Sequence, residues 1–347
     1  MAQRPTMKDV ARTAGVSIKT VSRVVNGETT VAPDLAARVR AAVASLEYRP
    51  HLGASLLRRS DPRTRTIGLL LEDVANPFSA AVHRAVAEAA HARGVHVLTG
   101  NLNDDPRRER ELAEAFGRRQ TDGLILAPTG ADQTHLAALG GLPIVFVDRP
   151  ASGIEADTVV STNVAGAAGA VRHLVAHGHR RIAYLGDHQR LPTARDRYHG
   201  YHRALGDRPG PVVHGLRDAV AAERAAVTVL RGPDPPTAIL TGQSRITVGA
   251  IRALRRLDRH WSVALIGFDD FPLADLLEPP ITVVAQDPAR LGRTAASALF
   301  ERIEGHRGPA RQIRIPTTLI PRGSGEIARS PCHRHPPPRG DEQVHDG

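Results

Sequence analysis

The stretch that decides the fold is Thr6-Met-Lys-Asp-Val-Ala-Arg-Thr-Ala-Gly-Val-Ser-Ile-Lys-Thr-Val-Ser-Arg-Val-Val-Asn26. Thr6 and Asp9 have the spacing of an N-cap pair that opens a helix. Gly15 supplies the backbone freedom for a sharp turn, and Ser17 is placed to cap a second helix. Two short helices around a tight turn are typical of the helix-turn-helix, which lays its second helix in the DNA major groove.

The second helix has an apolar face that is expected to pack against the domain and a polar face that is expected to be exposed. At about 100° per residue, Val21 and Val24 project away from an arc of polar and basic positions. That arc contains Ile18, Lys19, Ser22, Arg23 and Asn26. An ordinary amphipathic surface helix has the same pattern. The short join to the preceding helix and the basic residues on the outward face favour DNA binding.

A third helix completes this predicted domain. Pro33 lies near its first turn, and apolar residues follow at helical spacing. The apolar positions are Leu35, Val39, Val43 and Leu46, and they are expected to close a small core with Val10, Ala14 and Val21. Residues 1–50 are therefore predicted to form a small all-α helix-turn-helix domain.

The charge distribution agrees with a nucleic-acid partner. The chain has a net charge of +10, and residues 1–65 hold 12 Lys and Arg against 5 Asp and Glu. Such a cluster can neutralise DNA phosphates, although a solvated basic surface would look the same. Lys8 and Lys19 are the only lysines. The rest of the chain therefore has no lysine for a phosphate loop or a Schiff base, which excludes those enzyme classes.

Several short motifs in order make the resemblance specific. Lys8-Asp-Val-Ala, Ala14-Gly-Val-Ser, Thr20-Val-Ser-Arg-Val-Val-Asn26 and Leu46-Glu-Tyr-Arg-Pro50 are similar to the opening of the lactose-repressor (LacI/GalR) family of bacterial transcription regulators. The resemblance implies that Ile18, Lys19 and Arg23 read base edges. It implies that Thr20, Ser22 and Asn26 hold phosphates, and Ser17 at the helix start belongs to the same DNA-contacting set. An isoleucine as the first base reader departs from the polar or aromatic residue of many relatives.

Residues 51–65 resemble the family's hinge helix and linker. His51-Leu-Gly-Ala-Ser-Leu-Leu57 is too short to be a stable isolated helix, so it is expected to form when two copies meet on DNA. The resemblance places Leu57 as the wedge that enters the minor groove and kinks the duplex. A plain linker is the alternative, and Gly53 favours it by about 1 kcal/mol relative to alanine.

From residue 66 to 323, short β-branched runs alternate with amphipathic stretches. Predicted strands are Ile67–Leu71, His96–Thr99, Gly123–Leu126, Ile144–Val147, Ile182–Leu185, Ala238–Leu240 and Val263–Ile266. Predicted helices include Ser79–Arg93, Pro106–Arg119, Ala165–His177 and Arg245–Leu257. Such alternation builds parallel sheets covered by helices on both faces, and the length suggests two sheets. This part resembles the family's effector domain, which is similar to periplasmic sugar-binding proteins: two α/β lobes with the ligand between them.

Ligands of open α/β sheets bind beyond the carboxyl ends of strands. Residues at such ends include Asn76, Phe78, Asp148, Arg149, Gln243 and Asp269. The resemblance places Asn76, Phe78, Asp148, Arg149, Arg197, Asp269 and Gln286 on effector-pocket positions. Other roles remain open, since Asn76-Pro77 can cap a helix and Asp148-Arg149 can be a structural ion pair.

Two departures bear on the ligand. Gln243-Ser244 stands where the family usually has Asn-Asp, so one hydroxyl-binding carboxylate is missing, and Gly215-Leu-Arg-Asp218 lacks an aromatic residue. A cleft with Arg149, Arg197 and Arg245 and few rings is expected to prefer an acidic sugar or a polyol. The effector is therefore expected to be a sugar, a sugar acid or a polyol.

Other constellations are expected to carry no chemistry. His173, His177 and His179 have a metal-like spacing, but Gly178 indicates a helix end, which favours capping and packing. Cys332 and His335 lie in a Pro-rich segment, 324–347, that is expected to be a disordered tail. Nucleotide, zinc-protease and serine-hydrolase motifs are absent from the sequence, so no metal and no cofactor are expected.

The sequence therefore predicts a homodimeric DNA-binding repressor controlled by a small molecule, in which helices near Ser79–Arg93 and Pro106–Arg119 pair the subunits. Neither a secretion signal nor a membrane-spanning run is read from it, so a cytoplasmic protein, on the nucleoid when bound to DNA, is expected. One alternative is a sugar-binding protein without a DNA role. Another is an enzyme that uses Asp269 and Asp270 in the cleft, but adjacent strand-end residues point different ways.

Overall fold

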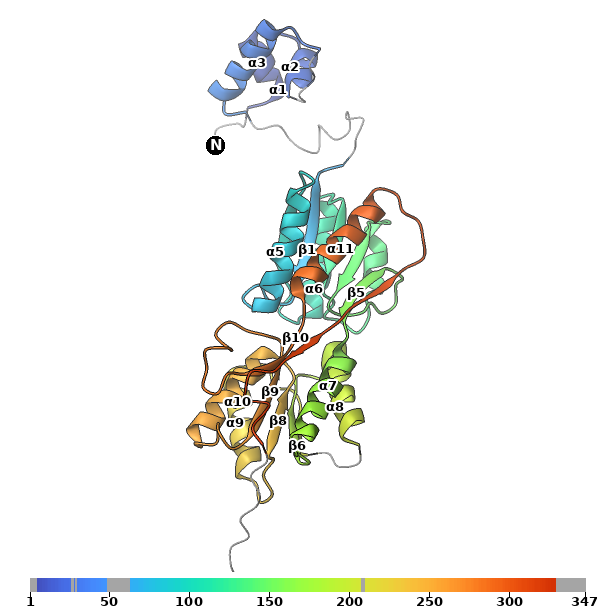
Figure 1. Ribbon diagram of the computed structural model, residues 1–347. Coiled ribbons are helices and arrows are strands. Elements are labelled where there is room, and N and C mark those ends of the chain that lie inside the picture. Colours follow the sequence, from blue (N-terminus) through green and yellow to red (C-terminus); the bar gives the residue numbers. More distant parts are fainter. Residues whose placement is uncertain (1–4, 26–27, 29, 49–62, 207–209, 329–347) are drawn as a thin grey trace, which may run out of the picture. The chain divides into compact units, whose positions relative to one another are not determined.

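The computed structural model describes residues 5–25, 28, 30–48, 63–206 and 210–328. Contacts divide them into two compact units. The first comprises the described residues up to Thr66 with Gln120–Asp122, and the second comprises the rest. Figure 1 shows the helices of the first unit in blue and the two lobes of the second in cyan to red.

The described part of the first unit contains helices α1 (Met7–Ala14), α2 (Ile18–Val25) and α3 (Pro33–Ser45). The predicted capping box is present, because Thr6 and Asp9 each bond the other's backbone amide through their side chains. Gly15 then takes a left-handed φ of 62° and ends α1. Ser17 Oγ accepts a hydrogen bond from the Thr20 amide at 3.1 Å, which caps the start of α2.

The three helices enclose one small core, as predicted. Val10, Val21 and Val39 are fully buried in it, and Tyr48 packs beside them. Val43 and Leu46 pack against this core at its edge, whereas Leu35 is partly exposed and the neighbouring Ala36 is buried instead. The apolar stripe of α3 is therefore rotated by one residue at its start relative to the prediction.

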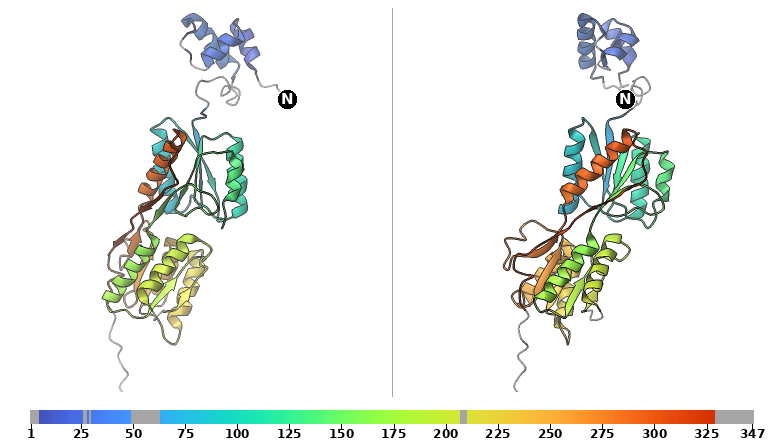
Figure 2. Two further views of the ribbon diagram at one scale, coloured as in Figure 1. Left: turned by 90° about the vertical axis from the view of Figure 1, so that its right-hand side faces the viewer. Right: turned by 45° about the vertical axis from the view of Figure 1, so that its right-hand side comes forward.

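The first lobe is built on a six-stranded sheet of order β11-β5-β4-β3-β1-β2. Its strands are β1 (Thr66–Leu71), β2 (His96–Asn101), β3 (Gly123–Leu126), β4 (Ile144–Val147), β5 (Asp157–Ser161) and β11 (Gln312–Ile315). Helices α5 (Pro77–His91) and α11 (Pro288–Ile303) cover one face, while α6 (Pro106–Arg118) and the short η1 (Thr134–Leu139) cover the other. Figure 2 shows α11 lying beside α5, although the two are far apart in sequence. Alternate residues of β1 supply the two cores, since Leu69 faces α5 and Leu70 faces α6.

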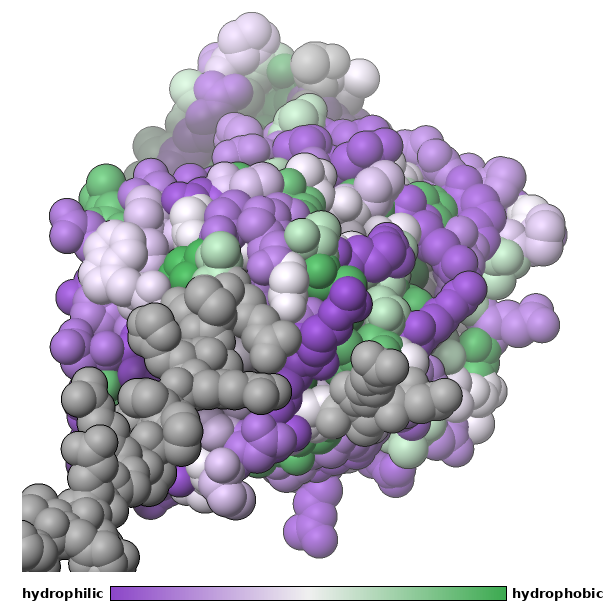
Figure 3. Space-filling view, turned by 60° about the horizontal axis from the view of Figure 1, so that its bottom comes forward, coloured by the Kyte–Doolittle hydropathy of each residue, from purple (hydrophilic) through white to green (hydrophobic). Residues whose placement is uncertain are grey.

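The second lobe repeats the design with a sheet of order β12-β10-β9-β8-β6-β7. Its strands are β6 (Ile182–Leu185), β7 (Val212–Val213), β8 (Ala238–Thr241), β9 (Ala264–Phe268), β10 (Thr282–Ala285) and β12 (Thr318–Ile320). Helices α7 (Asn163–Ala176) and α8 (Pro192–Leu205) cover one face, and α9 (Ala219–Arg231) and α10 (Ser244–Arg256) cover the other. On the end of this lobe shown in Figure 3, apolar side chains are scattered among hydrophilic ones.

Three chain segments connect the lobes. They follow β5, β10 and β11, so each lobe takes strands from distant parts of the sequence. Two of these segments are tied together, because the Thr317 amide donates to Thr162 Oγ1 at 3.0 Å. Segments of this kind can change their backbone angles while the two sheets remain intact, which suits a two-lobed hinge.

The predicted fold class is confirmed, and the seven predicted strands are present, three with the predicted bounds and four with ends that shift by one or two residues. Prediction missed β5, β7, β10, β11 and β12. Strands β7 and β12 have only two and three residues, and polar residues, such as Asp157, Thr158 and Ser161 in β5, interrupt the apolar pattern of others. Their place in a sheet depends on partners that the local sequence does not show.

The expected boundary between the second lobe and the tail is too early. Ser324 is 2% exposed, and its hydroxyl accepts from the Thr282 amide and donates to the Leu265 carbonyl. Glu326 Oε2 accepts from Thr282 Oγ1 at 2.7 Å. The lobe therefore continues beyond residue 323. Cys332 and His335 lie outside the described residues, as do Asn26 and the predicted hinge segment 51–62 with Leu57.

The histidines of the predicted helix end serve packing. His177 is the C-cap of α7, and its Nδ1 lies 2.9 Å from the His173 carbonyl oxygen. His179 is fully buried between Thr237 Oγ1 and the Ile327 carbonyl oxygen, and His173 contacts Glu326. Within the described ranges, no group of three or more His, Cys, Asp or Glu is arranged to hold a metal ion. No helix among the described residues is long and apolar enough to span a bilayer.

Candidate functional site

The first candidate site is the outward face of α2. Ile18 is 41% exposed although it is a large apolar residue, and Lys19 and Arg23 are exposed beside it. On the opposite side Val21 is fully buried, which fixes the helix on its domain. Burial of one face thus leaves a basic and apolar surface that protein packing does not use.

The other predicted DNA contacts on this helix are hydroxyls. Ser17 Oγ and Thr20 Oγ1 lie 2.9 Å apart at the helix start, and Ser22 is partly buried. Arg23 has a loose partner, since its Nε lies 3.5 Å from Glu28 Oε2 and both side chains are nearly half exposed. An exposed pair of this kind is worth about 0–1 kcal/mol, so it can be exchanged for a base or a phosphate at small cost.

The second candidate site is a cleft between the two lobes. All eight predicted effector residues line it: Asn76, Phe78, Asp148, Arg149, Arg197, Gln243, Asp269 and Gln286. The structure adds Glu72, Asp187, Leu191, Thr193, Ala194 and Gly242 to this lining. The open volume among these side chains is only about 40 Å³, enough for a few water molecules. A ligand must therefore displace side chains or part the lobes.

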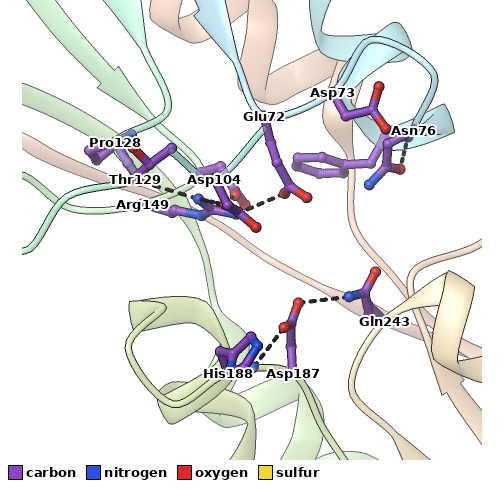
Figure 4. A network of polar contacts seen from close by, with 12 residues as sticks. Glu72, Asp73, Asn76, Asp104, Pro128, Thr129, Arg149, Asp187, His188 and Gln243 are labelled. Carbon is purple, nitrogen blue, oxygen red and sulfur yellow. Dashed lines mark hydrogen bonds and ion pairs between the residues drawn. The ribbon is translucent and has the colours of Figure 1, made fainter. Parts of the chain in front are cut away.

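Arg149 organises the first-lobe wall of the cleft (Figure 4). It is 3% exposed, and it donates to Asp104 Oδ1 at 2.9 Å, to Glu72 Oε2 at 2.8 Å and to the Pro128 carbonyl at 3.3 Å. The neighbouring Asp148 lies 3.6 Å from its Nε. One buried guanidinium thus serves three carboxylates.

Arg197 has the corresponding place in the second lobe. Its Nε donates to Asn163 Oδ1 at 2.8 Å and its Nη1 to the Gly242 carbonyl at 2.6 Å, while Asp269 Oδ2 lies 3.6 Å away. Its guanidinium carbon lies 4.0 Å from the centre of the Phe268 ring, a cation–π contact. These partners hold the side chain rigidly at the cleft wall.

The amide residues of the cleft are bound to its acids. Gln243 Nε2 donates to Asp187 Oδ2 at 2.7 Å, and Gln286 Nε2 donates to Asp269 Oδ1 at 2.6 Å. Asn76 caps α5 by accepting from the Phe78 amide, so the structural role considered for Asn76 is present. Asp187 therefore places a carboxylate beside Gln243 in the lining of the cleft.

Two cleft carboxylates stand on strained backbone. Asp148 and Asp269 both have φ of 69°, in the left-handed region that residues with a side chain rarely adopt. Each follows the end of its strand, β4 or β9, in equivalent places of the two lobes. Such strain persists where the surrounding structure holds it, and it is common at ligand sites.

Polar contacts cross the cleft and hold the lobes in this arrangement. Arg245 of the second lobe pairs with Asp73 of the first. Arg217 Nη2 lies 3.1 Å from Asp104 Oδ2, and Arg190 Nη2 donates to the Asp104 carbonyl at 3.4 Å. A change in cleft opening must break or rearrange these contacts.

Burial and crowding perturb the acids of the first-lobe wall. Burial raises the pKa of Glu72 to about 7; Arg149 opposes the rise, and Asp104, Asp148 and Asp187 add to it. Burial also raises the pKa of Asp148, against the pull of Arg149 and Arg197. Perturbed groups of this kind in a cleft are typical of functional sites.

The prediction missed Glu72, Asp104 and Asp187. Glu72 directly follows β1, and Asp187 follows β6 by two residues. The strand-end rule would therefore have found both, had it been applied at every strand. Asp104 lies in the loop after β2, and only the fold shows that it receives Arg149 and Arg217.

The structure removes the reason for expecting an acidic ligand. That expectation rested on Arg149, Arg197 and Arg245 being available to an anion. Each of the three lies beside a carboxylate of the protein: Asp104 and Glu72, Asp269, and Asp73, respectively. The possible enzymatic pair is also divided, because Asp270 faces Arg322 at 2.7 Å while Asp269 faces the cleft.

Comparison with known proteins covers both candidate sites. Residues 6–51 match the family model of bacterial regulatory proteins of the lacI family, and residues 171–325 match that of the periplasmic binding protein-like domain. The chain is 34% identical to the HTH-type transcriptional regulator PtxS of Pseudomonas aeruginosa over 332 residues, 92% of this chain and 96% of that protein.

Two further proteins show the same likeness over the whole length. The ribose operon repressor of Escherichia coli (strain K12) is 31% identical over 329 residues, 92% of this chain and 99% of that protein. The crystal structure of the lac repressor dimer bound to operator and the anti-inducer ONPF has a TM-score of 0.80 at 26% identity, covering 94% of this chain and 100% of that one.

Proposed function

This chain belongs to the lacI family of bacterial regulatory proteins and is a DNA-binding transcriptional regulator, and we propose that it is a homodimeric repressor of catabolic genes whose hold on its operator is set by a small effector in the interlobe cleft. It would work in the cytoplasm, on the nucleoid when bound to DNA. The observation that carries the proposal is the exposed set of Ile18, Lys19 and Arg23 on a helix whose other face is buried.

We assign direct base contacts to these three side chains. Lys19 and Arg23 have the donors that guanine O6 and N7 accept, and Ile18 suits a thymine methyl group. Ser17, Thr20 and Ser22 carry hydroxyls of the kind that hold phosphates and so orient the helix. Asn26 and Leu57 keep the predicted roles of phosphate contact and minor-groove wedge, although they lie outside the described residues.

We infer that the effector contacts the eight predicted cleft residues. They come from both lobes, and six of them follow the ends of strands, where α/β sheets bind ligands, while Phe78 and Arg197 lie on helices α5 and α8. A ligand that touches both walls has a different affinity for the open and closed cleft, and only such a difference can shift the equilibrium between them. Operator binding must then change effector affinity by the same factor.

The dimer is proposed to form along the first lobe. Helix α5 and strand β2 enclose a broad surface hollow that includes the exposed Val74, with Ala80, Ala87 and His91 along the helix. Helix α6, also predicted to pair subunits, presents mostly charged residues and buries Glu109 against Thr129. We therefore expect α5 to form the larger part of the interface.

A gel-shift experiment with the DNA upstream of the protein's own gene tests this function. The purified protein is expected to retard a specific fragment and to spare a scrambled one of equal length. A sugar-binding protein without a DNA role would retard neither fragment. Equal retardation of both fragments would contradict sequence-specific repression.

A further inference from the structure

Two carboxylates face one another across the cleft, and one of them, Asp187, has no ion pair among the residues that the structure describes. Glu72 comes from the end of β1 in the first lobe, and Asp187 comes from the end of β6 in the second. Figure 4 shows their side chains pointing toward one another from opposite walls. Neither Glu72 nor Asp187 is among the residues predicted to contact the effector.

Asp187 has only neutral hydrogen-bond donors among the described residues. Its Oδ2 accepts from the Gln243 amide at 2.7 Å, and its Oδ1 accepts from the His188 backbone amide at 2.6 Å. These bonds orient the carboxylate but do not balance its charge. The acid is partly buried, so solvent screens it less than it would a surface acid.

Glu72 has a cationic partner, but a shared one. Arg149 donates to it at 2.8 Å and to Asp104 at 2.9 Å, and Asp148 lies 3.6 Å from the same guanidinium. One positive charge therefore faces three carboxylates. Burial is the main cause of the raised pKa of Glu72 and Arg149 opposes it, while the negative charges of Asp104, Asp148 and Asp187 add to the rise.

The remaining arginines of the cleft do not remove this excess. Arg197 faces Asp269, Arg245 faces Asp73 and Arg217 faces Asp104. Arg190 reaches the Asp104 backbone carbonyl. Asp187 receives no direct ion pair from any of these residues, although they lie around the same cleft.

Two buried polar atoms of the cleft are incompletely bonded. Arg149 Nε and Gln286 Oε1 form no hydrogen bond with any described residue. The carboxylate beside Arg149 Nε, that of Asp148, lies 3.6 Å away, which is beyond hydrogen-bond distance. A donor and an acceptor left open in one small cavity indicate a ligand with hydroxyl groups, which both donate and accept.

We propose that the effector carries a protonated amine that lies between Glu72 and Asp187, and that it is a small polyhydroxylated amine such as an amino sugar. This inference rests on the proposed function. An ammonium group has three donors and can bond both carboxylates, whereas a sugar carboxylate would add a further negative charge there. Because the two acids belong to different lobes, the amine contacts both walls of the cleft.

Matched ligand triplets test the charge of the effector at pH 7.5. Calorimetry compares glucose, glucosamine and glucuronate, then galactose, galactosamine and galacturonate, with the full-length protein. In at least one triplet the amine is expected to bind about 10-fold or more tightly than the neutral sugar, with no detectable binding of the acid. N-acetylglucosamine, which retains the nitrogen without its charge, should bind no better than glucose.

Two variants locate the charge. Glu72→Gln and Asp187→Asn are each expected to weaken binding of the amine about 10-fold or more. The affinity for the neutral sugar should stay within about 3-fold of the wild-type value. Glu114→Gln, an exposed acid on α6 far from the cleft lining, should change neither. Thermal unfolding of each variant verifies that it is folded.

The inference is overturned if neither glucosamine nor galactosamine binds. It is also overturned if the neutral or the acidic sugar binds more tightly than the amine in both triplets. Unchanged amine binding in both Glu72→Gln and Asp187→Asn overturns it as well. Operator retardation by the ligand-free protein, measured on the same samples, tests the proposed function separately. A protein that binds its operator and releases it only with a neutral sugar would retain the function and lose the amine.

Discussion

The recognition helix and the interlobe cleft use charge in opposite ways. On the DNA-binding unit, Lys19 and Arg23 are exposed, and the acid beside Arg23, Glu28, is five residues away in the sequence and 3.5 Å away in space. In the cleft, Arg149 and Glu72 are 77 residues apart, and Arg245 and Asp73 are 172 residues apart. The helix surface is thus available to another molecule, whereas the cleft is first satisfied by the protein itself. The difference teaches that DNA contact is a local property here, while effector choice depends on long-range pairing.

The largest expected effect is on the helix. Replacing Ile18, Lys19 and Arg23 together by alanine is expected to weaken operator binding about a thousand-fold, because each base contact is worth about 1–3 kcal/mol. Thermal unfolding should be nearly unchanged, since these side chains are exposed and contribute little to the core. Fluorescence anisotropy with operator and scrambled DNA measures the loss.

Arg40→Ala is the matched control on α3. It removes one positive charge from an exposed position of the same unit. It should therefore weaken binding to operator and to scrambled DNA by the same factor and leave the ratio of the two affinities unchanged. If the triple variant also loses affinity for operator and scrambled DNA by the same factor, the three residues contact phosphates only and the assignment to base edges fails.

The second-largest expected effect is on stability and concerns the buried carboxylate of Asp157. Asp157 has a fully buried side chain between Arg302 and Arg311, with contacts of 2.7–2.9 Å. Burial alone would raise its pKa, but the hydrogen bonds from the two arginines lower it below the ordinary value. Asp157→Ala is expected to lower the free energy of unfolding by about 3–5 kcal/mol, because it removes the buried carboxylate that both arginines share and leaves Arg302 without its acidic partner.

Urea unfolding measures this loss, with Glu301→Ala as the control. Glu301 bonds the same Arg311 at 2.7 Å but is 49% exposed, so its removal should cost about 0–1 kcal/mol. Similar losses in the two variants would mean that burial does not distinguish these pairs.

A third effect depends on pH. Glu72 titrates at a pKa of about 7 in the folded protein and at 4.5 when unfolded, so the folded state keeps a proton that the unfolded state has lost between these values. Stability should therefore fall as pH rises from about 4.5 to 7, by about 3 kcal/mol from this group. Glu72→Gln should make the decline shallower, as measured by urea unfolding between pH 5 and 8.

Part of the decline in stability with pH should remain in Glu72→Gln, because the pKa of Asp148 is also raised. Glu114→Gln on the surface should leave the whole decline in place. An identical slope in wild type and Glu72→Gln would show that Glu72 is not held in its protonated form by the fold.

The smallest expected effect concerns the contacts across the cleft. Arg245 and Asp73 are partly exposed, so Arg245→Ala should weaken the closed arrangement by about 0.5–1 kcal/mol. A larger average radius of gyration in small-angle scattering would report the opening. Arg256→Ala on the same helix, whose partner Glu223 is in the same lobe, should leave the radius unchanged. Equal radii in the two variants would mean that the Arg245 pair does not hold the lobes.

Apart from Arg197 and Gln286, which the family resemblance placed, the sequence by itself determined the helix-turn-helix, the alternating α/β lobes and the other six cleft positions. Those features follow from local rules: a cap three residues from its partner, a glycine at a turn, an apolar residue every third or fourth place, and polar residues where a buried strand ends. Thr6 with Asp9 and Gly15 needed no distant neighbour to be read correctly.

Only the tertiary structure decided which charges of the cleft remain unpaired. Arg149, Arg197 and Arg245 look available in sequence, yet each lies beside an acid brought from another strand end or from the other lobe. Asp187 shows the reverse, because its only described hydrogen bonds come from neutral donors. The strength of a charge depends on its distance to other charges and on burial, and both are fixed only when distant segments pack together.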